Sequence, residues 1–386
     1  MEEWKQYRLI DVLDKLIDYR GKTPKKTTSG VPLITAKIIK NGCIEKPTEF
    51  ISVDDYDSWM VRGFPKAGDV VLTTEAPLGE VAQLYDENIA LAQRVVTLRG
   101  KAGVLDNTYL KYYLMSNVGQ QRIKARETGT TVTGIKQSEL REVIVDCPPY
   151  KRQLEIASIL SSLDDKIELN RKINANLEAQ AQALFKSWFV DFEPFKDQPF
   201  VESELGMIPE GWRVGKLGEL CTFKRGKNLL TKDAIDEGVP VVAGGLEPSC
   251  YHNVSNTKSP VVTVSGSGAN AGFMRMYYQE VWASDCSFID STCENLLFVY
   301  CFLSVNRRLL RHAQTGAVQP HVKPSDIHDF DIVIPPKRII EEFQTKIQES
   351  IQMRGSIEKE NSRLASLRDT LLPRLMSGEL KVNEVI

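Results

Sequence analysis

Two long stretches of the chain carry hydrophobic residues at alternating spacings of four and three, the pattern of a helix that buries one seam. The first, residues 153–188, contains no glycine or proline, and the second is residues 338–375. At 1.5 Å per residue, about 36 residues give a rod of roughly 54 Å. Two such helices in one chain predict an antiparallel coiled coil. Polar residues that interrupt the seams and would fix the register are Asn170, Asn174, Arg354 and Arg368.

The regions before the long helices have a different pattern, with short β-branched runs bounded by glycine and aspartate, which is typical of strands. Apolar residues at helical spacing after capping-type residues predict a helix over residues 107–115. Residues 4–19 also show roughly helical spacing. The pattern therefore predicts an α+β fold, with two mixed α/β units and two long helices. The predicted strands of the first unit are residues 31–35, 69–74, 81–85 and 94–98.

An internal repeat organises the whole chain. The Thr/Gly-rich loop at residues 128–136 recurs at 315–323, and the register between the two copies is 187 residues from about residue 126 to 184. Earlier landmarks, such as Trp4 and Trp212, are 208 apart, so about 21 residues are missing from the middle of the second unit. Pairs that share the 187-residue offset include Ile135/Val322, Lys136/Lys323, Pro148/Pro335, Pro149/Pro336, Asn174/Asn361 and Leu184/Leu371.

The repeat and the change of pattern together give the domain boundaries. A stretch rich in prolines and glycines follows the first long helix and is predicted to be a linker. The predicted order is a first globular unit, a first long helix, the linker, a second globular unit, and a second long helix with a tail. Their residues are 1–150, 151–190, 191–211, 212–337 and 338–378.

Composition narrows the class of protein. The 386 residues have a net charge of −2, and 26% are charged, as is ordinary for a globular protein. No apolar run reaches the roughly 18–20 residues of a membrane helix, and no secretory signal is visible, so a cytoplasmic protein is expected. The seven cysteines form no Cys-x-x-Cys pair and the four histidines show no metal-ligand spacing. Free thiols and no metal site are therefore expected.

Several local motifs resemble cofactor or catalytic sites but lack an essential part. Residues 20–23 (Arg-Gly-Lys-Thr) lack the earlier glycine of a phosphate-binding loop, and residues 266–272 miss the dinucleotide spacing by one. Residues 146–150 (Asp-Cys-Pro-Pro-Tyr) contain a cysteine that splits an amino-methyltransferase motif, so the two prolines are interpreted as a hinge. Asp164 and Asp165 are interpreted as a solvated helix face. No nucleophile, acid or base constellation stands out.

Positive side chains recur at equivalent places in the two units. Arg20 and Lys22 flank a glycine in the first unit, and the second unit repeats this pattern. Lys136 and Lys323 each follow the Thr/Gly loop. Glycine, hydroxyl groups and lysine suit close approach to a phosphate backbone. The alternative, that each loop is a structural turn with an exposed lysine, stays open.

Any DNA-binding surface must be local. Residues 1–150 hold 21 Lys and Arg against 20 Asp and Glu, and residues 205–336 hold 12 against 13. Sequence reading is expected in the divergent middles of the units, where Gln83, Gln93 and other polar residues are able to reach base edges. The candidate DNA-binding residues are Arg20, Lys22, Lys25, Arg94, Thr133, Lys136, Arg225, Lys227, Asn270, Arg275, His321 and Lys323.

The whole chain resembles the specificity (S) subunit of type I restriction-modification systems. The resemblance rests on the duplicated Thr-Gly…Ile/Val-Lys…Pro-Pro-helix pattern and on the helical run at residues 153–170. It also rests on the phrase Leu-Gly-Met-Ile-Pro-Glu-Gly-Trp at residues 205–212 and on Leu-Leu-Pro-Arg-Leu-Met-Ser-Gly-Glu-Leu at residues 371–380. The second long helix departs from this pattern, because its seam is less regularly apolar than the seam of the first helix.

The resemblance implies a non-catalytic DNA-reading subunit. Each globular unit would be a target recognition domain for half of an asymmetric, bipartite DNA site, in a pseudo-twofold arrangement. The helices would form a spacer that binds two methyltransferase (modification) subunits, and restriction subunits with ATP-driven translocation would join some complexes. S-adenosylmethionine, ATP and Mg would belong to those partners, and none of them to this chain.

Two other classes of protein are compatible with the pattern alone. A coiled-coil interaction scaffold would use the duplicated units to bind protein or sugar, and would select no DNA. A self-sufficient methyltransferase would bind S-adenosylmethionine without a partner, which the missing cofactor motif argues against.

Overall fold

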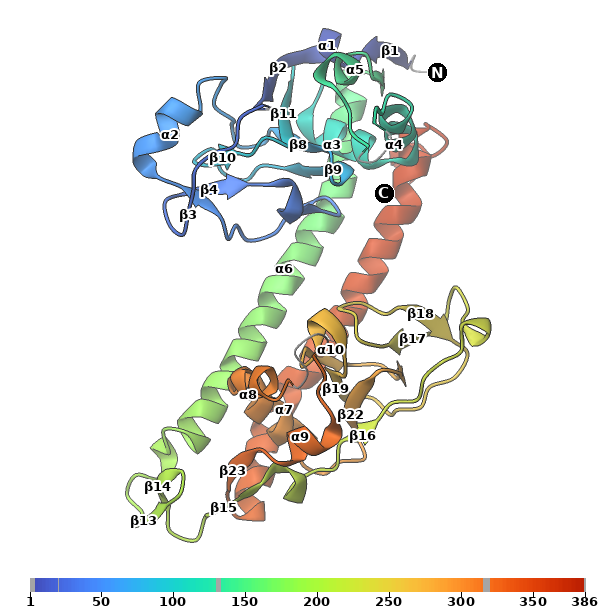
Figure 1. The fold of residues 1–386 in the computed structure, drawn as a ribbon. Coiled ribbons are helices and arrows are strands. Elements are labelled where there is room, and N and C mark those ends of the chain that lie inside the picture. Colours follow the sequence, from blue (N-terminus) through green and yellow to red (C-terminus); the bar gives the residue numbers. More distant parts are fainter. Residues whose placement is uncertain (1–3, 20, 130–132, 315–319, 385–386) are drawn as a thin grey trace. The chain divides into compact units, whose positions relative to one another are not determined.

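The computed structural model describes residues 4–19, 21–129, 133–314 and 320–384, and the chain divides into two compact units. Unit 1 comprises Met1–Ile167 and Arg363–Ile386, and unit 2 comprises Glu168–Ser362. Each unit contains a β-rich domain and a part of both long helices (Figure 1). The predicted α+β fold class is confirmed.

The two long helices are α6 (Tyr150–Phe189) and α10 (Lys337–Met376), which confirms both predicted rods to within three residues. They pack against each other in both units. In unit 2, Asn170 contacts Asn361, and Asn174 approaches the Arg354 carbonyl oxygen. The residue number of the partner falls as the number on α6 rises, so the pair is antiparallel, as predicted.

The predicted seam of α6 is buried over most of its length. Ile156 and Leu160 are buried in unit 1 and Ala181 in unit 2. Near the end of α6, Phe185 and Phe189 are buried instead of the predicted Leu184 and Trp188, which are only partly buried. A straight helix has 3.6 residues per turn and therefore drifts out of a strict heptad seam.

Unit 1 contains two four-stranded sheets, with strand orders β2-β11-β8-β9 and β10-β4-β7-β3, and a separate β1-β12 pair. In β8, Val70 and Leu72 belong to the core cluster that includes α6 and α10, whereas Val71 belongs to the cluster between the sheets. Because both faces are covered, the first three residues of the strand are all apolar instead of alternating with polar ones. The strands are β1 (Lys5–Arg8), β2 (Leu13–Asp18), β3 (Lys26–Thr27), β4 (Val31–Ile34), β5 (Ile39–Lys40), β6 (Cys43–Ile44), β7 (Phe50–Ile51), β8 (Val70–Thr74), β9 (Leu78–Gln83), β10 (Ala90–Leu91), β11 (Val95–Gly100) and β12 (Ile144–Cys147).

Helices α3 and α4 pack against the β2-β11-β8-β9 sheet, whereas α2 packs with the other sheet. Residues 107–115 form α3 as predicted, and Asp106 caps it by accepting from Tyr109 N (2.8 Å). The shorter helices of this unit are α1 (Leu9–Val12), α2 (Val53–Trp59), α3 (Asn107–Met115), α4 (Asn117–Lys124), α5 (Gln137–Arg141), η1 (Ala36–Ile38) and η6 (Val382–Glu384).

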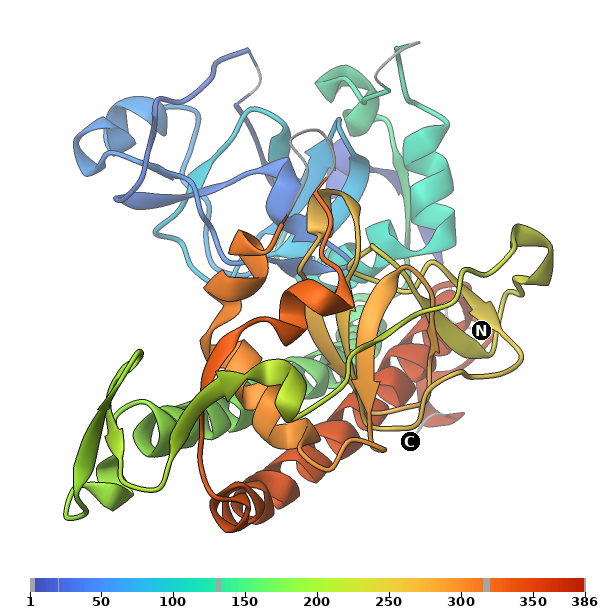
Figure 2. The ribbon, with the colours of Figure 1, turned by 60° about the horizontal axis from the view of Figure 1, so that its bottom comes forward.

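Unit 2 repeats this plan with sheets ordered β16-β22-β19-β20 and β18-β17-β21, and a β15-β23 pair. In Figure 2 the gold and orange strands of unit 2 lie over the long helices, and Val262 and Val264 of β19 share a core cluster with Phe343 of α10. Its strands are β13 (Phe200–Ser203), β14 (Gly206–Pro209), β15 (Arg213–Lys216), β16 (Lys224–Arg225), β17 (Val239–Val242), β18 (Cys250–His252), β19 (Val261–Ser265), β20 (Met274–Tyr277), β21 (Trp282–Ala283), β22 (Cys286–Asp290) and β23 (Asp331–Ile334). Its shorter helices are α7 (Leu296–Val305), α8 (Arg307–His312), α9 (Pro324–His328), η2 (Glu193–Phe195), η3 (Leu217–Glu219), η4 (Thr231–Asp233) and η5 (Gly268–Asn270).

The sheet registers confirm both repeat offsets. Lys5 pairs with Cys147 in unit 1, and Arg213 pairs with Ile334 in unit 2, so one offset is 208 and the other is 187. Most of the missing residues of unit 2 fall where unit 1 has the β5-β6 hairpin and α2. In unit 2 the described residues between β18 and β19 form a loop instead.

Two local predictions are wrong, and the predicted linker contains regular structure. Residues 4–19 form β1, the single turn α1 and β2 rather than a helix, because β1 and β2 find partners in the distant strands β12 and β11. The predicted linker holds η2 and the β13-β14 hairpin. Asp164 is not solvated: it accepts from Tyr112 Oη (2.6 Å) and pairs with Arg368 Nη1 (2.8 Å) and Lys111 Nζ (3.1 Å).

Candidate nucleic-acid interface

The Thr/Gly loop of unit 1 lies at one end of the strands of the β2-β11-β8-β9 sheet. The strands are antiparallel, so the end of β2, the end of β8 and the start of β11 meet there. Thr74 N donates to Arg94 O (3.0 Å), and Ile135 N donates to Thr74 O (3.0 Å). Gly134 forms a bridge with Glu75. Thr74, Glu75, Arg94 and the loop residues 133–136 are called the loop edge of unit 1.

Unit 2 builds the same edge with the same main-chain hydrogen bonds. Gly266 N donates to Asp285 O (3.1 Å), and Val322 N donates to Gly266 O (3.1 Å). His321 forms a bridge with Ser267, as Gly134 does with Glu75 in unit 1. The loop edge of unit 2 therefore comprises Gly266, Ser267, Asp285 and residues 321–323, and Asp285 occupies the position that Arg94 has in unit 1.

The loop edges bring together most of the predicted DNA-binding residues. In unit 1, Thr23 Oγ1 donates to Gln93 Oε1 (3.1 Å), which places the loop after β2 next to Arg94. In unit 2, Lys227 N donates to Ala283 O (2.9 Å), two residues before Asp285. The predicted residues at or beside the edges are Lys22, Arg94, Thr133, Lys136, Arg225, Lys227, His321 and Lys323. Arg20 lies outside the described residues.

Four other candidate residues lie away from the loop edges or bond to groups of their own domain, namely Lys25, Asn270, Gln83 and Arg275. Lys25 lines a depression with Asp55 and Trp59. The Asn270 amide donates to Gly244 O (3.3 Å) beside the edge of unit 2. Gln83 pairs with Val70 at the other edge of its sheet, so it does not join the cluster.

Arg275 points away from the loop edge of unit 2. Its guanidinium donates to Leu246 O (3.1 Å) and to Glu247 Oε2 (3.2 Å), and it lies over the Tyr277 ring. Burial acts to lower the pKa of Arg275, but Tyr277 and Glu247 more than offset it and raise the pKa. These contacts give Arg275 a structural role within unit 2.

Each loop edge carries one exposed arginine bound to a carboxylate. Arg94 Nε is 2.8 Å from Glu75 Oε1, and Arg225 Nη2 is 3.2 Å from Asp285 Oδ1. Asp285 also accepts a hydrogen bond from Ser267 Oγ. The sequence search for basic residues missed Glu75, Ser267 and Asp285, although the first two lie in the segments where the repeats diverge.

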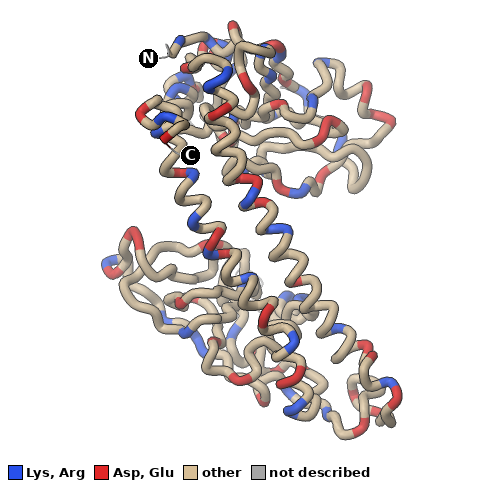
Figure 3. Tube along the Cα trace, turned by 180° about the vertical axis from the view of Figure 1, so that it is seen from behind, with Lys and Arg blue, Asp and Glu red and all other residues tan. Residues whose placement is uncertain are grey.

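The lysines of the edges are free to meet an anion. Lys22, Lys136, Lys227 and Lys323 are exposed, and no carboxylate of the described residues lies within 4.0 Å of their ammonium groups. Elsewhere acidic and basic residues are interspersed along the chain (Figure 3). These exposed lysines are therefore a local feature of the edges, because the acidic and basic residues of each domain nearly balance.

Within the described ranges, no group of His, Cys, Asp and Glu side chains is arranged to hold a metal ion. Over those same residues, every helix is too short or too polar to cross a bilayer. All seven cysteines are free, and burial raises the pKa of Cys221 and Cys301 thiols above their ordinary value, which keeps them unreactive.

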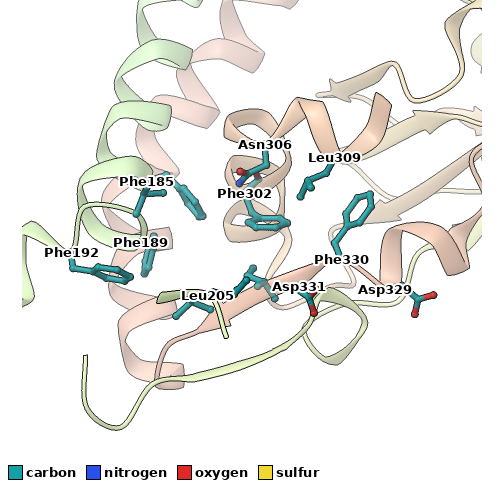
Figure 4. A pocket seen from close by; sticks show the side chains of 13 residues that line it. Phe185, Phe189, Phe192, Leu205, Phe302, Asn306, Leu309, Asp329, Phe330 and Asp331 are labelled. Atoms are coloured by element: carbon teal, nitrogen blue, oxygen red, sulfur yellow. The ribbon is translucent and has the colours of Figure 1, made fainter. Parts of the chain in front are cut away.

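Unit 2 also has an aromatic cavity of about 570 Å³ where α6 ends (Figure 4). Phe185 and Phe189 of α6 face Phe302 of α7 across it. Val190, directly after α6, and Leu205, in the turn between β13 and β14, line this cavity and are 47% and 48% exposed. These two residues are called the hairpin patch. A partly open apolar surface of this kind is typical of a protein-binding site.

Comparison with known proteins gives a consistent result over nearly the whole chain. The family model for the type I restriction modification DNA specificity domain matches residues 1–179 and 209–365. The MjaIX specificity subunit of Methanocaldococcus jannaschii is 31% identical over 92% of this chain and 88% of its own length. The HindI specificity subunit of Haemophilus influenzae is 24% identical over 98% of this chain and 100% of its own length. The S subunit from Mycoplasma genitalium has the same fold, with a TM-score of 0.61, 20% identity, and coverage of 97% of this chain and 96% of its own.

Proposed function

Because this chain belongs to the type I restriction modification DNA specificity family and is a non-catalytic specificity subunit, we propose that its two loop edges read the two halves of a bipartite DNA target. One observation carries this proposal. The edges share three main-chain relationships, yet the side chains at equivalent positions differ: Glu75 against Ser267, and Arg94 against Asp285. A repeated framework with different polar groups suits two half-sites of different sequence, so the target is asymmetric.

The domain assignment follows from the repeat. Residues 1–150 and 212–337 are the target recognition domains, and residues 151–190 and 338–378 are the spacer helices with the C-terminal tail. Residues 191–211 connect the first helix to the second recognition domain. The helices act as a spacer that sets the separation of the half-sites. A rod of roughly 54 Å exceeds the ~34 Å of one DNA turn, which leaves room for half-sites about one turn apart.

The edge lysines supply the sequence-independent part of binding. Lys22 and Lys136 in the first domain, and Lys227 and Lys323 in the second, contact phosphates, because they are exposed and unpaired within the described chain. The small residues of each loop admit the backbone closely. Each recognition domain carries almost no net charge and therefore neutralises few phosphates. Its binding to DNA outside the target sequence is weak for that reason.

The chemistry belongs to partners. Two methyltransferase subunits dock on the chain, and the hairpin patch with the aromatic cavity offers one of them an apolar surface in unit 2. Restriction subunits join that complex. S-adenosylmethionine, ATP and Mg are bound by those subunits, and the complex works in the cytoplasm.

The experiment is methylation profiling of host DNA with the partner methyltransferase, in the presence and absence of this chain. A gapped, asymmetric motif methylated only when the chain is present is the expected result. Selection of duplexes from a random pool by the same complex is expected to give the same motif. A scaffold that binds protein or sugar predicts no motif in either experiment, and that outcome would sink the proposal.

A further inference from the structure

We propose that Arg94 and Arg225 each read a guanine in one half-site, and that Glu75 and Asp285 are the residues that position them. This inference rests on the proposed DNA-reading function and adds to it a base, a direction of hydrogen bonding and a pair of positioning carboxylates. It also separates two basic side chains that read sequence from the lysines that bind phosphate.

In unit 1 the arginine comes from the start of β11. Arg94 and Glu75 form an ion pair with 2.8 Å between Nε and Oε1, and both side chains stay open to solvent, 47% and 41% exposed. The carboxylate lies closest to Nε, so the terminal guanidinium nitrogens stay available. The main-chain atoms on both sides of this pair are fixed, because Thr74 N donates to Arg94 O and Glu75 forms a bridge with Gly134.

In unit 2 the arginine and the carboxylate come from other positions than in unit 1. Asp285 stands at the position of Arg94, and the arginine comes from the neighbouring strand β16. Arg225 Nη2 donates to Asp285 Oδ1 at 3.2 Å and remains 56% exposed. Ser267 donates to the other oxygen of the same carboxylate, so Asp285 is fixed from two sides. The same device, an arginine held by an acid, is thus built from different strands.

Guanine is the base that this arrangement fits. An arginine fork donates two hydrogen bonds to O6 and N7 of guanine, the commonest specific contact in the major groove. A carboxylate that holds one side of the guanidinium reduces the conformational freedom lost on binding. An exposed ion pair contributes little to stability, so the two pairs are poorly explained as devices that hold the fold.

The other basic residues do not share this arrangement. The edge lysines have a single ammonium group and no positioning acid within the described residues, which suits a phosphate. Arg275 is held inside unit 2 by Leu246 O, Glu247 and the Tyr277 ring. Among the described residues, Arg94 and Arg225 each combine exposure, a fork and a positioning carboxylate at a loop edge.

The test compares methylation motifs produced by the full complex of this chain and its methyltransferase partner. The variants are Arg94→Lys and Arg225→Lys, which keep the charge and lose the fork, with Arg94→Gln and Arg225→Gln beside them. Each lysine variant is expected to lose discrimination, by at least tenfold, at one guanine of one half-site, and to leave the other half-site unchanged. Glu75→Gln and Asp285→Asn are expected to weaken discrimination at the same guanine as their arginine partners.

Controls make the outcomes distinct. Lys136→Gln, a phosphate contact in the same edge, is expected to reduce methylation without changing the motif. If the lysine variants keep the parent motif, or relax a base other than guanine, the inference is wrong. The same holds if one substitution relaxes both half-sites. If the unaltered complex gives no gapped motif, the proposed function itself has failed. Thermal unfolding of each variant shows whether a loss of methylation reflects unfolding. Where a lysine variant is unfolded at the assay temperature, the motif is determined with the glutamine variant at a lower temperature.

Discussion

Asn170 of α6 and Asn361 of α10 face each other inside unit 2, with 2.9 Å between Asn170 Nδ2 and Asn361 Oδ1. The second hydrogen of the same amide is donated to Glu360 Oε2 at 2.7 Å. Asn170 is buried to 1% exposure in a seam that is otherwise largely apolar. A buried polar contact of this kind weakens a helix pair but selects one register, because any slip leaves the amide without a partner.

Replacing Asn170 alone should therefore cost more than replacing both partners. In Asn170→Leu, the Asn361 and Glu360 oxygens lose their donor, which costs about 1–3 kcal/mol. In the double variant Asn170→Leu, Asn361→Leu, apolar packing replaces the polar contact, and the free energy of unfolding should equal or exceed that of the parent. Urea unfolding of the four proteins of this cycle measures the coupling. Additive effects of the two substitutions would contradict the assigned contact.

A second prediction concerns Asp164 in unit 1. Burial acts to raise the pKa of Asp164, but Lys111, the Tyr112 hydroxyl and Arg368 outweigh it, so the pKa is lowered. A lowered folded-state pKa stabilises the fold above the unfolded pKa of about 4, and that contribution disappears as the pH falls through the folded pKa. Asp164→Asn should cost about 3 kcal/mol at pH 7, because two cations lose their partner.

The pH dependence supplies the control for Asp164. The variant should lose less stability than the parent when the pH is lowered from 5 to 3, as measured by urea midpoints. Asp165→Asn, on the exposed neighbouring position, should leave both the midpoint at pH 7 and the acid dependence within about 0.5 kcal/mol of the parent. A parallel acid profile for Asp164→Asn and the parent would rule out this role.

The long-range periodic features of this fold were readable from the sequence, and the ones that depend on distant partners were not. The two helices, α3 and the repeat offsets follow from local spacing and from self-comparison. Residues 4–19 have helical spacing but form strands, since β1 and β2 pair with β12 and β11, which are over 75 residues away. Tertiary pairing overrode the local pattern.

The candidate site was also predictable only in part, because the role of some of its residues depends on distant partners. Lys136 and Lys323 were found because the repeat marks them. Glu75 and Asp285 were not, because their meaning depends on which side chain faces them, and that is set by the sheet register. A search for basic residues also included Arg275, whose contacts with Glu247 and Tyr277 show it to be held by its own domain.

A third prediction separates phosphate contacts from base contacts. Lys136→Gln and Lys323→Gln should each lower affinity for target and non-target duplexes by similar factors. Each should also reduce the slope of log K against log salt by about one, because one fewer counterion is released. Fluorescence anisotropy at several salt concentrations, with the partner present, measures both quantities. Lys25→Gln, away from the loop edge, should leave the slope unchanged, and an unchanged slope in Lys136→Gln would assign that lysine no phosphate.

A fourth prediction concerns the hairpin patch. Val190→Asp and Leu205→Asp place a charge on side chains that are 47% and 48% exposed, so the fold should tolerate them. If a methyltransferase subunit covers the patch, burying the charge should weaken association at least tenfold. Val61→Asp, at an apolar side chain of unit 1 that is 68% exposed, is the matched control and should bind normally. Equal binding of all three variants in a sedimentation assay would move the docking surface elsewhere.

The last prediction tests the helices as a spacer. Unit 1 anchors them through the Asp164–Arg368 ion pair, and unit 2 through Glu178–Arg354. Residues 167–173 of α6 and 357–363 of α10 lie between these anchors, so removing both segments deletes one heptad from each helix and keeps the seam in phase. Seven residues correspond to about 10 Å of helix, or roughly three base pairs of DNA.

The shortened chain should therefore methylate the same two half-sites with a gap about three base pairs shorter. Methylation profiling with the partner subunit measures the gap directly. Deleting five residues instead of seven from each helix rotates the apolar seams by about 140° and turns them away from each other, and that control should lose activity rather than change the gap. Because the half-site sequences serve as an internal standard, an unchanged gap in an active heptad-deletion variant would show that the helices do not set the spacing.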